Sequence, residues 1–150
     1  MAKILVSVQA DQFTDDQIKR LEAVLRRNYA EHVTDTKVTV IWCVVPQGQF
    51  YTNYKLSRSS LISMECEPGF PQDRREQLLH ACGSDWAAIT GQDQNEVMLT
   101  LLEQELFNTA FSSTRDRLTA AGRIRFLWHT ISSLVSSKVR KGYLSFSPNM

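Results

Sequence analysis

Residues 2–8 read Ala-Lys-Ile-Leu-Val-Ser-Val. This short, mostly apolar stretch, in which Lys3 and Ser7 are the polar residues, is typical of a strand. Side chains on a strand alternate between its two faces, so one set of this stretch can be buried while the other meets a different environment. We therefore predict a strand over about residues 3–8. The rest of the fold is organised around it.

A helix is predicted directly after this strand. Thr14 suits the N-cap position, Gln17 completes a capping box, and Phe13 can pack on Ile18 as a hydrophobic staple. Apolar side chains then recur at helical spacing as far as His32, which predicts one buried face. These residues are Ile18, Leu21, Val24, Leu25 and Tyr29.

Residues 38–45 are β-branched and apolar almost throughout, which is typical of a strand covered on both faces. Pro46, Gln47 and Gly48 predict the turn that ends it. The aromatic and polar segment 50–60 suits a hairpin, or an arm that reaches a neighbouring subunit.

The second half repeats this order, with a strand at 61–66, a helix from Gln72 to Gly91 and a strand at 96–102, each offset by about 57 residues from its counterpart. We predict an α/β (α+β) fold with a duplicated β-α-β unit: a four-stranded mixed sheet with two helices on one face. The other sheet face then needs a cover, most simply from other subunits. The alternative is a ferredoxin-like sandwich, in which the two units pair antiparallel.

The C-terminal part differs in charge from the rest. Residues 1–112 hold 10 Lys and Arg against 15 Asp and Glu, a net charge of −5, whereas residues 113–150 hold 7 against 1, a net charge of +6. We predict two regions: a domain over 1–112, with units at about 2–48 and 60–105, and a basic helical extension over 113–150. The periodicity places the helix of this extension from Ser113 to about Arg140, packed on the same domain or on a neighbouring subunit.

Several classes of function are not expected. A content of 43% hydrophobic residues argues against disorder, and no apolar run approaches the roughly 20 residues of a membrane span. The odd, widely spaced cysteines Cys43, Cys66 and Cys82 fit neither a disulfide framework nor a zinc site. We expect buried thiols in a cytoplasmic protein, with no metal, cofactor, nucleic-acid partner or membrane partner.

The segments KILVSVQADQFTDDQ (residues 3–17) and VIWCVVPQGQF (residues 40–50), with the second β-α-β unit, resemble the tautomerase superfamily. The likeness is strongest to its long-chain trimeric branch, which includes cis-3-chloroacrylic acid dehalogenase. It covers about residues 2–105 and implies a homotrimer. The extension has no counterpart in it.

In that family an N-terminal proline acts as general base or acid, and arginines hold the carboxylate of the substrate. The resemblance places Ala2 at the position of the catalytic proline. It implies substrate-binding positions at Tyr29, Arg74, Arg75 and Thr100, although several of these differ from the residue types of the family. No acidic residue matches the family's water-activating carboxylate; Glu103 and Glu105 are the nearest.

Two functions remain open. The first is a weak or divergent isomerase or tautomerase, or a hydratase or decarboxylase, acting on small 2-oxo or unsaturated carboxylic acids through an N-terminal amine. The second is a catalytically inactive trimeric scaffold or binding protein.

Overall fold

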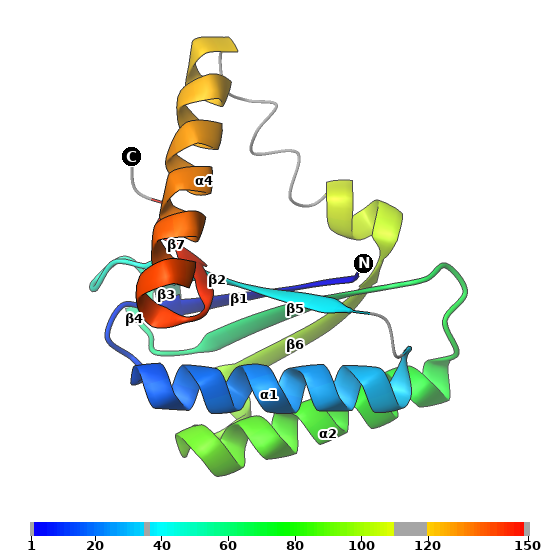
Figure 1. Cartoon of the computed structure of the whole chain (residues 1–150). Coiled ribbons are helices and arrows are strands. Elements are labelled where there is room, and N and C mark those ends of the chain that lie inside the picture. The colour runs from blue at the N-terminus through cyan, green and yellow to red at the C-terminus, as the bar shows by residue number, and fades with distance from the viewer. Residues whose placement is uncertain (1, 35–36, 110–119, 149–150) are drawn as a thin grey trace.

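A computed structural model describes residues 2–34, 37–109 and 120–148 of the chain. Helices α1 and α2 cover one face of a mixed sheet, and α4 rises on the other side (Figure 1). The strands are β1 (Ala2–Gln9), β2 (Val38–Val45), β3 (Tyr51–Thr52), β4 (Lys55–Leu56), β5 (Ser60–Cys66), β6 (Val97–Glu103) and β7 (Leu144–Phe146). The helices are α1 (Asp15–His32), α2 (Gln72–Thr90), the 3-10 turn η1 (Gln94–Glu96) and α4 (Ala120–Lys141), and residues 104–109 are also helical.

The main sheet has the strand order β6-β5-β1-β2-β7. Strand β1 runs parallel to β2, and β5 runs parallel to β6, which confirms the duplicated β-α-β unit. The two units meet in an antiparallel pair, with Ile4 opposite Met64. Antiparallel pairing between the two units is the feature by which the sequence analysis distinguishes a ferredoxin-like sandwich. That criterion is wrong, because this fold has such pairing too. The parallel pairs inside each unit are what exclude the sandwich.

Over the described ranges the main sheet has five strands where four were predicted. The additional strand β7 pairs parallel with β2, with Trp42 opposite Ser145. It follows α4 through Gly142, whose φ of +85° favours glycine and lets the chain turn back to the sheet edge. The predicted start of the last helix at Ser113 lies outside the described residues, and from Ala120 onward the helix is confirmed.

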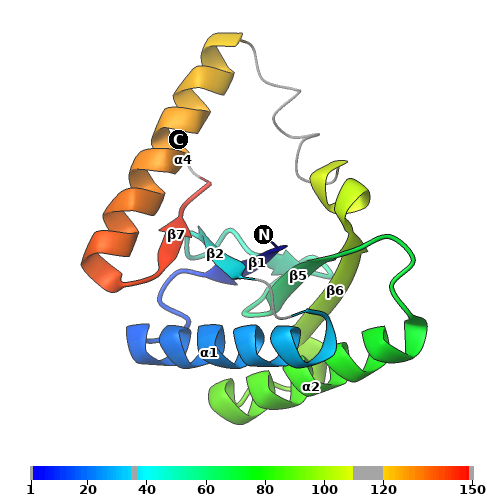
Figure 2. The same ribbon diagram turned by 45° about the vertical axis from the view of Figure 1, so that its right-hand side comes forward.

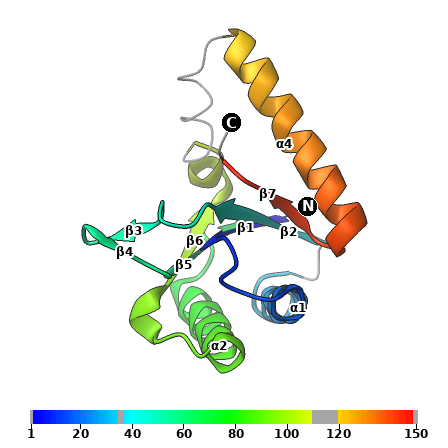
Figure 3. The ribbon, with the colours of Figure 1, turned by 90° about the vertical axis from the view of Figure 1, so that its left-hand side faces the viewer.

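Local sequence signals explain the helix ends. Thr14 Oγ1 accepts a hydrogen bond from the Gln17 amide at 3.2 Å, and Gln17 Oε1 accepts one from the Thr14 amide at 3.0 Å, so the predicted capping box is confirmed. Helix α2 ends at Gly91, which has a left-handed backbone and donates to the Ala87 carbonyl at 2.8 Å. The segment 50–60 forms the predicted hairpin, β3–β4, which projects beside the sheet (Figure 3).

The core lies between the sheet and the helices α1 and α2. Ile4, Val6 and Val8 of β1 point to this side, where Trp42 and Trp86 stack with ring centroids 6.0 Å apart. The alternate side chains form the opposite side, which we call the open face because neither α1 nor α2 covers it (Figure 2). Its apolar members include Leu5, Ile41, Cys43, Leu61, Met98 and Leu102.

Candidate functional site

A cavity of about 140 Å³ lies at the start of β1. Because β1 and β5 are antiparallel, the first residue of β1 comes beside the last residues of β5, and the end of α1 closes the same corner. The lining residues are Ala2, Tyr29, Thr34, Glu65, Cys66, Glu67 and Gln104. Two of the five predicted site residues, Ala2 and Tyr29, are therefore brought together here.

Tyr29 is buried in the last turn of α1, and its hydroxyl donates a hydrogen bond to the Glu65 carbonyl at 2.6 Å. Burial raises the pKa of Tyr29 to about 12, and the nearby Cys66, Glu65 and Glu67 add to the shift. The phenol is therefore neutral at physiological pH, and its hydroxyl proton is donated to the backbone carbonyl of Glu65. Tyr29 holds the end of α1 against β5 as well as lining the cavity.

This burial makes stability depend on pH. A tyrosine whose pKa is raised from 10.0 in the unfolded chain to about 12 in the folded one stabilises the fold fully below pH 10. That contribution is lost as the pH rises from 10 toward 12. Replacing Tyr29 with phenylalanine should cost about 1 kcal/mol at neutral pH and flatten the loss at alkaline pH. Urea unfolding at pH 7 to 11.5 measures both effects. The control is Tyr54→Phe, because Tyr54 is 98% exposed; an equally steep alkaline loss in both variants would contradict the assignment.

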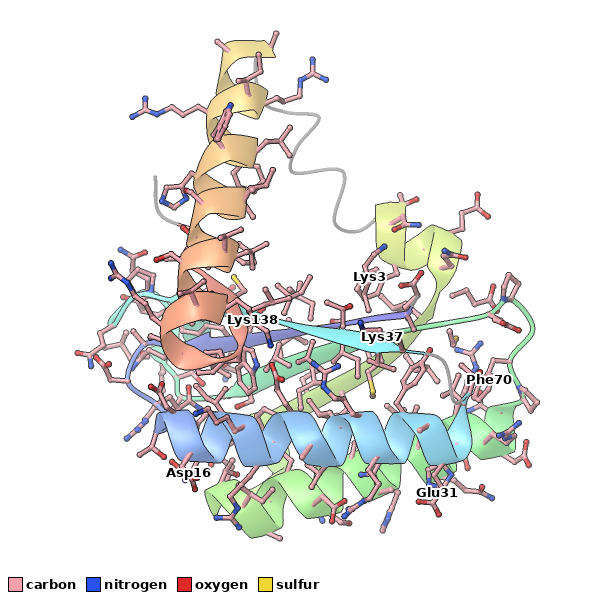
Figure 4. The ribbon with its side chains drawn as sticks, viewed as in Figure 1. Lys3, Asp16, Glu31, Lys37, Phe70 and Lys138 are labelled. Carbon is pink, nitrogen blue, oxygen red and sulfur yellow. The ribbon has the colours of Figure 1, made fainter. Side chains whose placement is uncertain are left out.

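The cavity is acidic. Glu65 is almost fully buried, and its Oε2 accepts from the Lys3 amide at 3.1 Å and lies 4.0 Å from Lys3 Nζ. Glu67 is exposed beside it, and no lysine or arginine is among the described residues that line the cavity. Lys3 comes from the first strand, at the end of the sheet where Phe70 also lies (Figure 4). Two acidic residues thus line the cavity, and Lys3 is a nearby cation that pairs with one of them, Glu65.

The thiols show no sign of activation. Burial raises the pKa of Cys66, which lines the cavity, above its ordinary value, and the Arg75 guanidinium only partly opposes this shift. Burial also raises the pKa of Cys43 and brings that of Cys82 to about 12. A nucleophilic cysteine needs a lowered pKa, so these side chains are packing thiols.

Arg74 lies in an adjoining cavity of about 330 Å³. Its lining residues are Val33, Thr34, Glu67, Pro68, Gly69, Phe70, Pro71 and Arg74. The two cavities share Thr34 and Glu67, so they are neighbours. The Arg74 guanidinium lies 5.5 Å from the centre of the Phe70 ring.

Arg75 and Thr100 line neither cavity. Arg75 donates hydrogen bonds to the Phe70 carbonyl at 3.0 Å, the Leu101 carbonyl at 3.1 Å and a Glu103 carboxylate oxygen at 3.3 Å. Thr100 Oγ1 donates to Ser63 Oγ at 3.0 Å, on the open face. These contacts are internal to the fold.

Sequence reasoning missed Thr34, Glu65, Cys66, Glu67 and Gln104 as site residues. Glu65 and Cys66 enter the cavity only because β5 is antiparallel to β1. Within the part of the chain that the structure describes, no three His, Cys, Asp or Glu side chains are grouped as a metal site would require. No described helix combines the length and apolar character needed to cross a bilayer.

No protein-family model matches the chain, and the curated proteins include no significant relative by sequence. Solved structures do match it. The protein Ps01740 has 19% identity and a TM-score of 0.63, over 67% of this chain and 92% of that one. A fused 4-OT in a symmetric trimer has 14% identity and a TM-score of 0.61, over 67% and 84%.

The FG41 malonate semialdehyde decarboxylase, inhibited by 3-bromopropiolate, has 12% identity and a TM-score of 0.57, over 67% of this chain and 82% of that one. At these identities the likeness concerns the fold. It agrees in extent with the two β-α-β units, which span about residues 2–105. The chain therefore has the fold of the tautomerase superfamily.

Proposed function

We propose that this chain is a trimeric, tautomerase-fold binding protein that does not use an N-terminal amine for catalysis. The observation that carries the proposal is the charge of the cavity at Ala2. Glu65 and Glu67 line it, and no described lysine or arginine does. A cavity of this charge favours a small neutral or cationic ligand over a carboxylic acid.

The same charge argues against a basic amine at this position. Removal of Met1 would place the α-amine on Ala2, one residue from the Lys3 amide that Glu65 binds at 3.1 Å. Carboxylates stabilise the protonated form of a neighbouring amine, whereas a general base must be unprotonated. Family-like chemistry needs the opposite environment, with cations beside the amine.

A weaker case remains for an isomerase or tautomerase, or a hydratase or decarboxylase, acting on small 2-oxo or unsaturated acids. Ala2 and Tyr29 share one cavity, and Arg74 lies in the next, across Thr34 and Glu67. An acid long enough to span both cavities could place its carboxylate on Arg74 and its reacting carbons near Ala2. In this second candidate Arg74 is the substrate-binding arginine.

The trimer belongs to the proposal. The open face carries Leu5, Ile41 and Leu61. Within the described part of the chain, neither α1 nor α2 covers this face. The fused 4-OT with this fold is a trimer. A homotrimer would bury these side chains between subunits. We also assign the chain to the cytoplasm, because Cys43, Cys66 and Cys82 are all free thiols.

Turnover assays separate the two candidates. Purified chain, with its N-terminus defined by intact-mass spectrometry, is incubated with phenylpyruvate and with 2-hydroxymuconate. We expect no turnover above buffer, and none after Ala2→Pro, because the carboxylates of the cavity remain. Turnover that falls at least tenfold in Arg74→Met would overturn the binding-protein proposal and establish the enzyme. Arg20→Met is the matched control, because Arg20 is exposed on α1 and lines neither cavity.

A further inference from the structure

Helix α4 exposes a row of apolar side chains, which we call the outer stripe. It consists of Ile124, Leu127, Trp128, Ile131, Val135 and Val139. Their spacing of three and four residues places them on one side of the helix. Trp128 is 71% exposed, Ile131 53% and Val139 80%. An apolar patch of this extent on a helix marks an interaction surface.

The opposite side of α4 faces the helix's own chain. Ser137 is buried, and its hydroxyl accepts a hydrogen bond from the Ser145 amide of β7 at 2.8 Å. His129 and Ser133, on the same side, are half-buried beside a groove of about 620 Å³ between α4 and β7. A helix in a self-sufficient domain buries its apolar side on its own core. Here the small and polar side faces inward and the apolar side faces out.

We propose that the outer stripe packs on the open face of a neighbouring copy of this chain. Helix α4 and the open face lie on the same side of the molecule, because α4 rises from the β7 edge of the sheet, away from α1 and α2 (Figures 1 and 3). Their dimensions match: a helix of 22 residues is about 33 Å long, and strands of 8 residues extend about 26 Å. Within the described residues, each copy thus supplies both an exposed apolar stripe on α4 and a sheet face that neither α1 nor α2 covers.

Charge favours the same partner. Helix α4 carries five cationic side chains and no acidic one. They are Arg123, Arg125, Lys138, Arg140 and Lys141. Residues 1–112 carry a net charge of −5, so the helix of one copy is drawn to the body of another. Complementary charge of this kind raises the association rate and orients the approach.

The proposed contact also bears on the type of assembly. A helix stripe and a sheet face are different surfaces, so a head-to-tail contact between them is heterologous, and it closes into a ring where the rotation from one copy to the next closes. Three copies give a closed ring, in agreement with the trimer on which this inference rests. In that ring α4 is the arm that joins each subunit to the next.

The test compares two charges on one helix. Ile131→Asp places a carboxylate in the outer stripe, and Ser136→Asp places one at an exposed position outside it. Light scattering after gel filtration, with the full chain at micromolar concentration, should give three chains for the wild type and Ser136→Asp, and one for Ile131→Asp. Circular dichroism should show the same helix content in all three.

A cysteine in place of Met98, which is 62% exposed on the open face, identifies the docking surface. The double variant Ile131→Cys/Met98→Cys, in a mixture of ¹⁴N- and ¹⁵N-labelled chains treated with a short bismaleimide, should give a peptide that links the two introduced thiols and carries both labels. Restoring Met98 should remove it. A trimer whose Ile131→Cys links only within one chain contradicts docking on the open face of a neighbour.

The outcomes distinguish this inference from the trimer itself. If the wild type is a trimer and Ile131→Asp remains one, the role of α4 is wrong while the trimer stands. A monomeric wild type would contradict both the trimer and the role of α4. A cationic helix with an apolar stripe could instead lie on an anionic membrane. Sedimentation of the wild type with phosphatidylserine and phosphatidylcholine vesicles, lost in Ile131→Asp without any change of mass, would replace the neighbouring copy with a lipid surface.

Discussion

Replacing Trp86 with alanine is expected to lower the free energy of unfolding by about 3–5 kcal/mol. Trp86 is fully buried in α2, stacks on Trp42 with ring centroids 6.0 Å apart and makes a T-shaped contact with Phe13 at 5.8 Å. Its Nε1 donates to Gln92 Oε1 at 2.8 Å, so the variant loses a buried hydrogen bond as well as the ring. The free energy of unfolding of a native protein is about 5–15 kcal/mol, so the loss expected for this variant is a large part of the total.

Urea unfolding followed by circular dichroism measures this cost. Trp86→Phe is the matched variant, because it keeps an aromatic ring against Trp42 and loses mainly volume and the bond to Gln92. We expect about 1–2 kcal/mol for it. An alanine variant within 1 kcal/mol of the wild type would mean that the stack of two tryptophans is not the centre of the core.

The elements that the sequence predicted well are those whose signals are local. The start of α1 depends on Thr14 and Gln17, which bond to each other across one turn, and the end of α2 depends on Gly91 alone. Apolar periodicity also predicted the buried face of α1, on which Ile18, Leu21 and Tyr29 lie. Such features need no knowledge of distant residues.

The features that the sequence did not reveal depend on long-range pairing. Strand β7 is three residues long, and nothing in Leu-Ser-Phe indicates a strand until α4 and Gly142 return it to the edge of β2. Likewise, only the antiparallel register of β1 and β5 brings Glu65 to Ala2 and makes the cavity acidic. Register is decided by the packing of whole faces, not by local pattern.

The two adjacent arginines show the same division between local and distant information. The sequence predicted both Arg74 and Arg75 as candidates to hold a substrate carboxylate. The structure gives them different surroundings: Arg74 is exposed over Phe70, whereas the Arg75 side chain is 19% exposed and bonds to residues 70, 101 and 103. Arg75 therefore joins the loop before α2 to the end of β6.

Arg75→Met is expected to lower the free energy of unfolding by about 2–4 kcal/mol. The change leaves the Phe70 and Leu101 carbonyls without this donor and leaves Glu103 without its cation, and hydrogen bonds from a charged group contribute about 1.5–3 kcal/mol each, with partial additivity. Arg74→Met, one residue away, should cost less than about 1 kcal/mol, because only its exposed contact with Phe70 is lost.

Urea unfolding of Arg75→Met and Arg74→Met, measured together, shows whether Arg75 has a structural role or is available to bind a ligand. Equal and small costs would show that Arg75 is no more structural than Arg74, and the carboxylate-binding role would remain open to both. A large cost for Arg75→Met alone leaves Arg74 as the one arginine of this pair that is free to meet a ligand. An enzymatic function of the cavity at Ala2 would then depend on Arg74, which lines the neighbouring cavity. The acidic residues Glu65 and Glu67, which line the cavity at Ala2 itself, would oppose the binding of a substrate carboxylate.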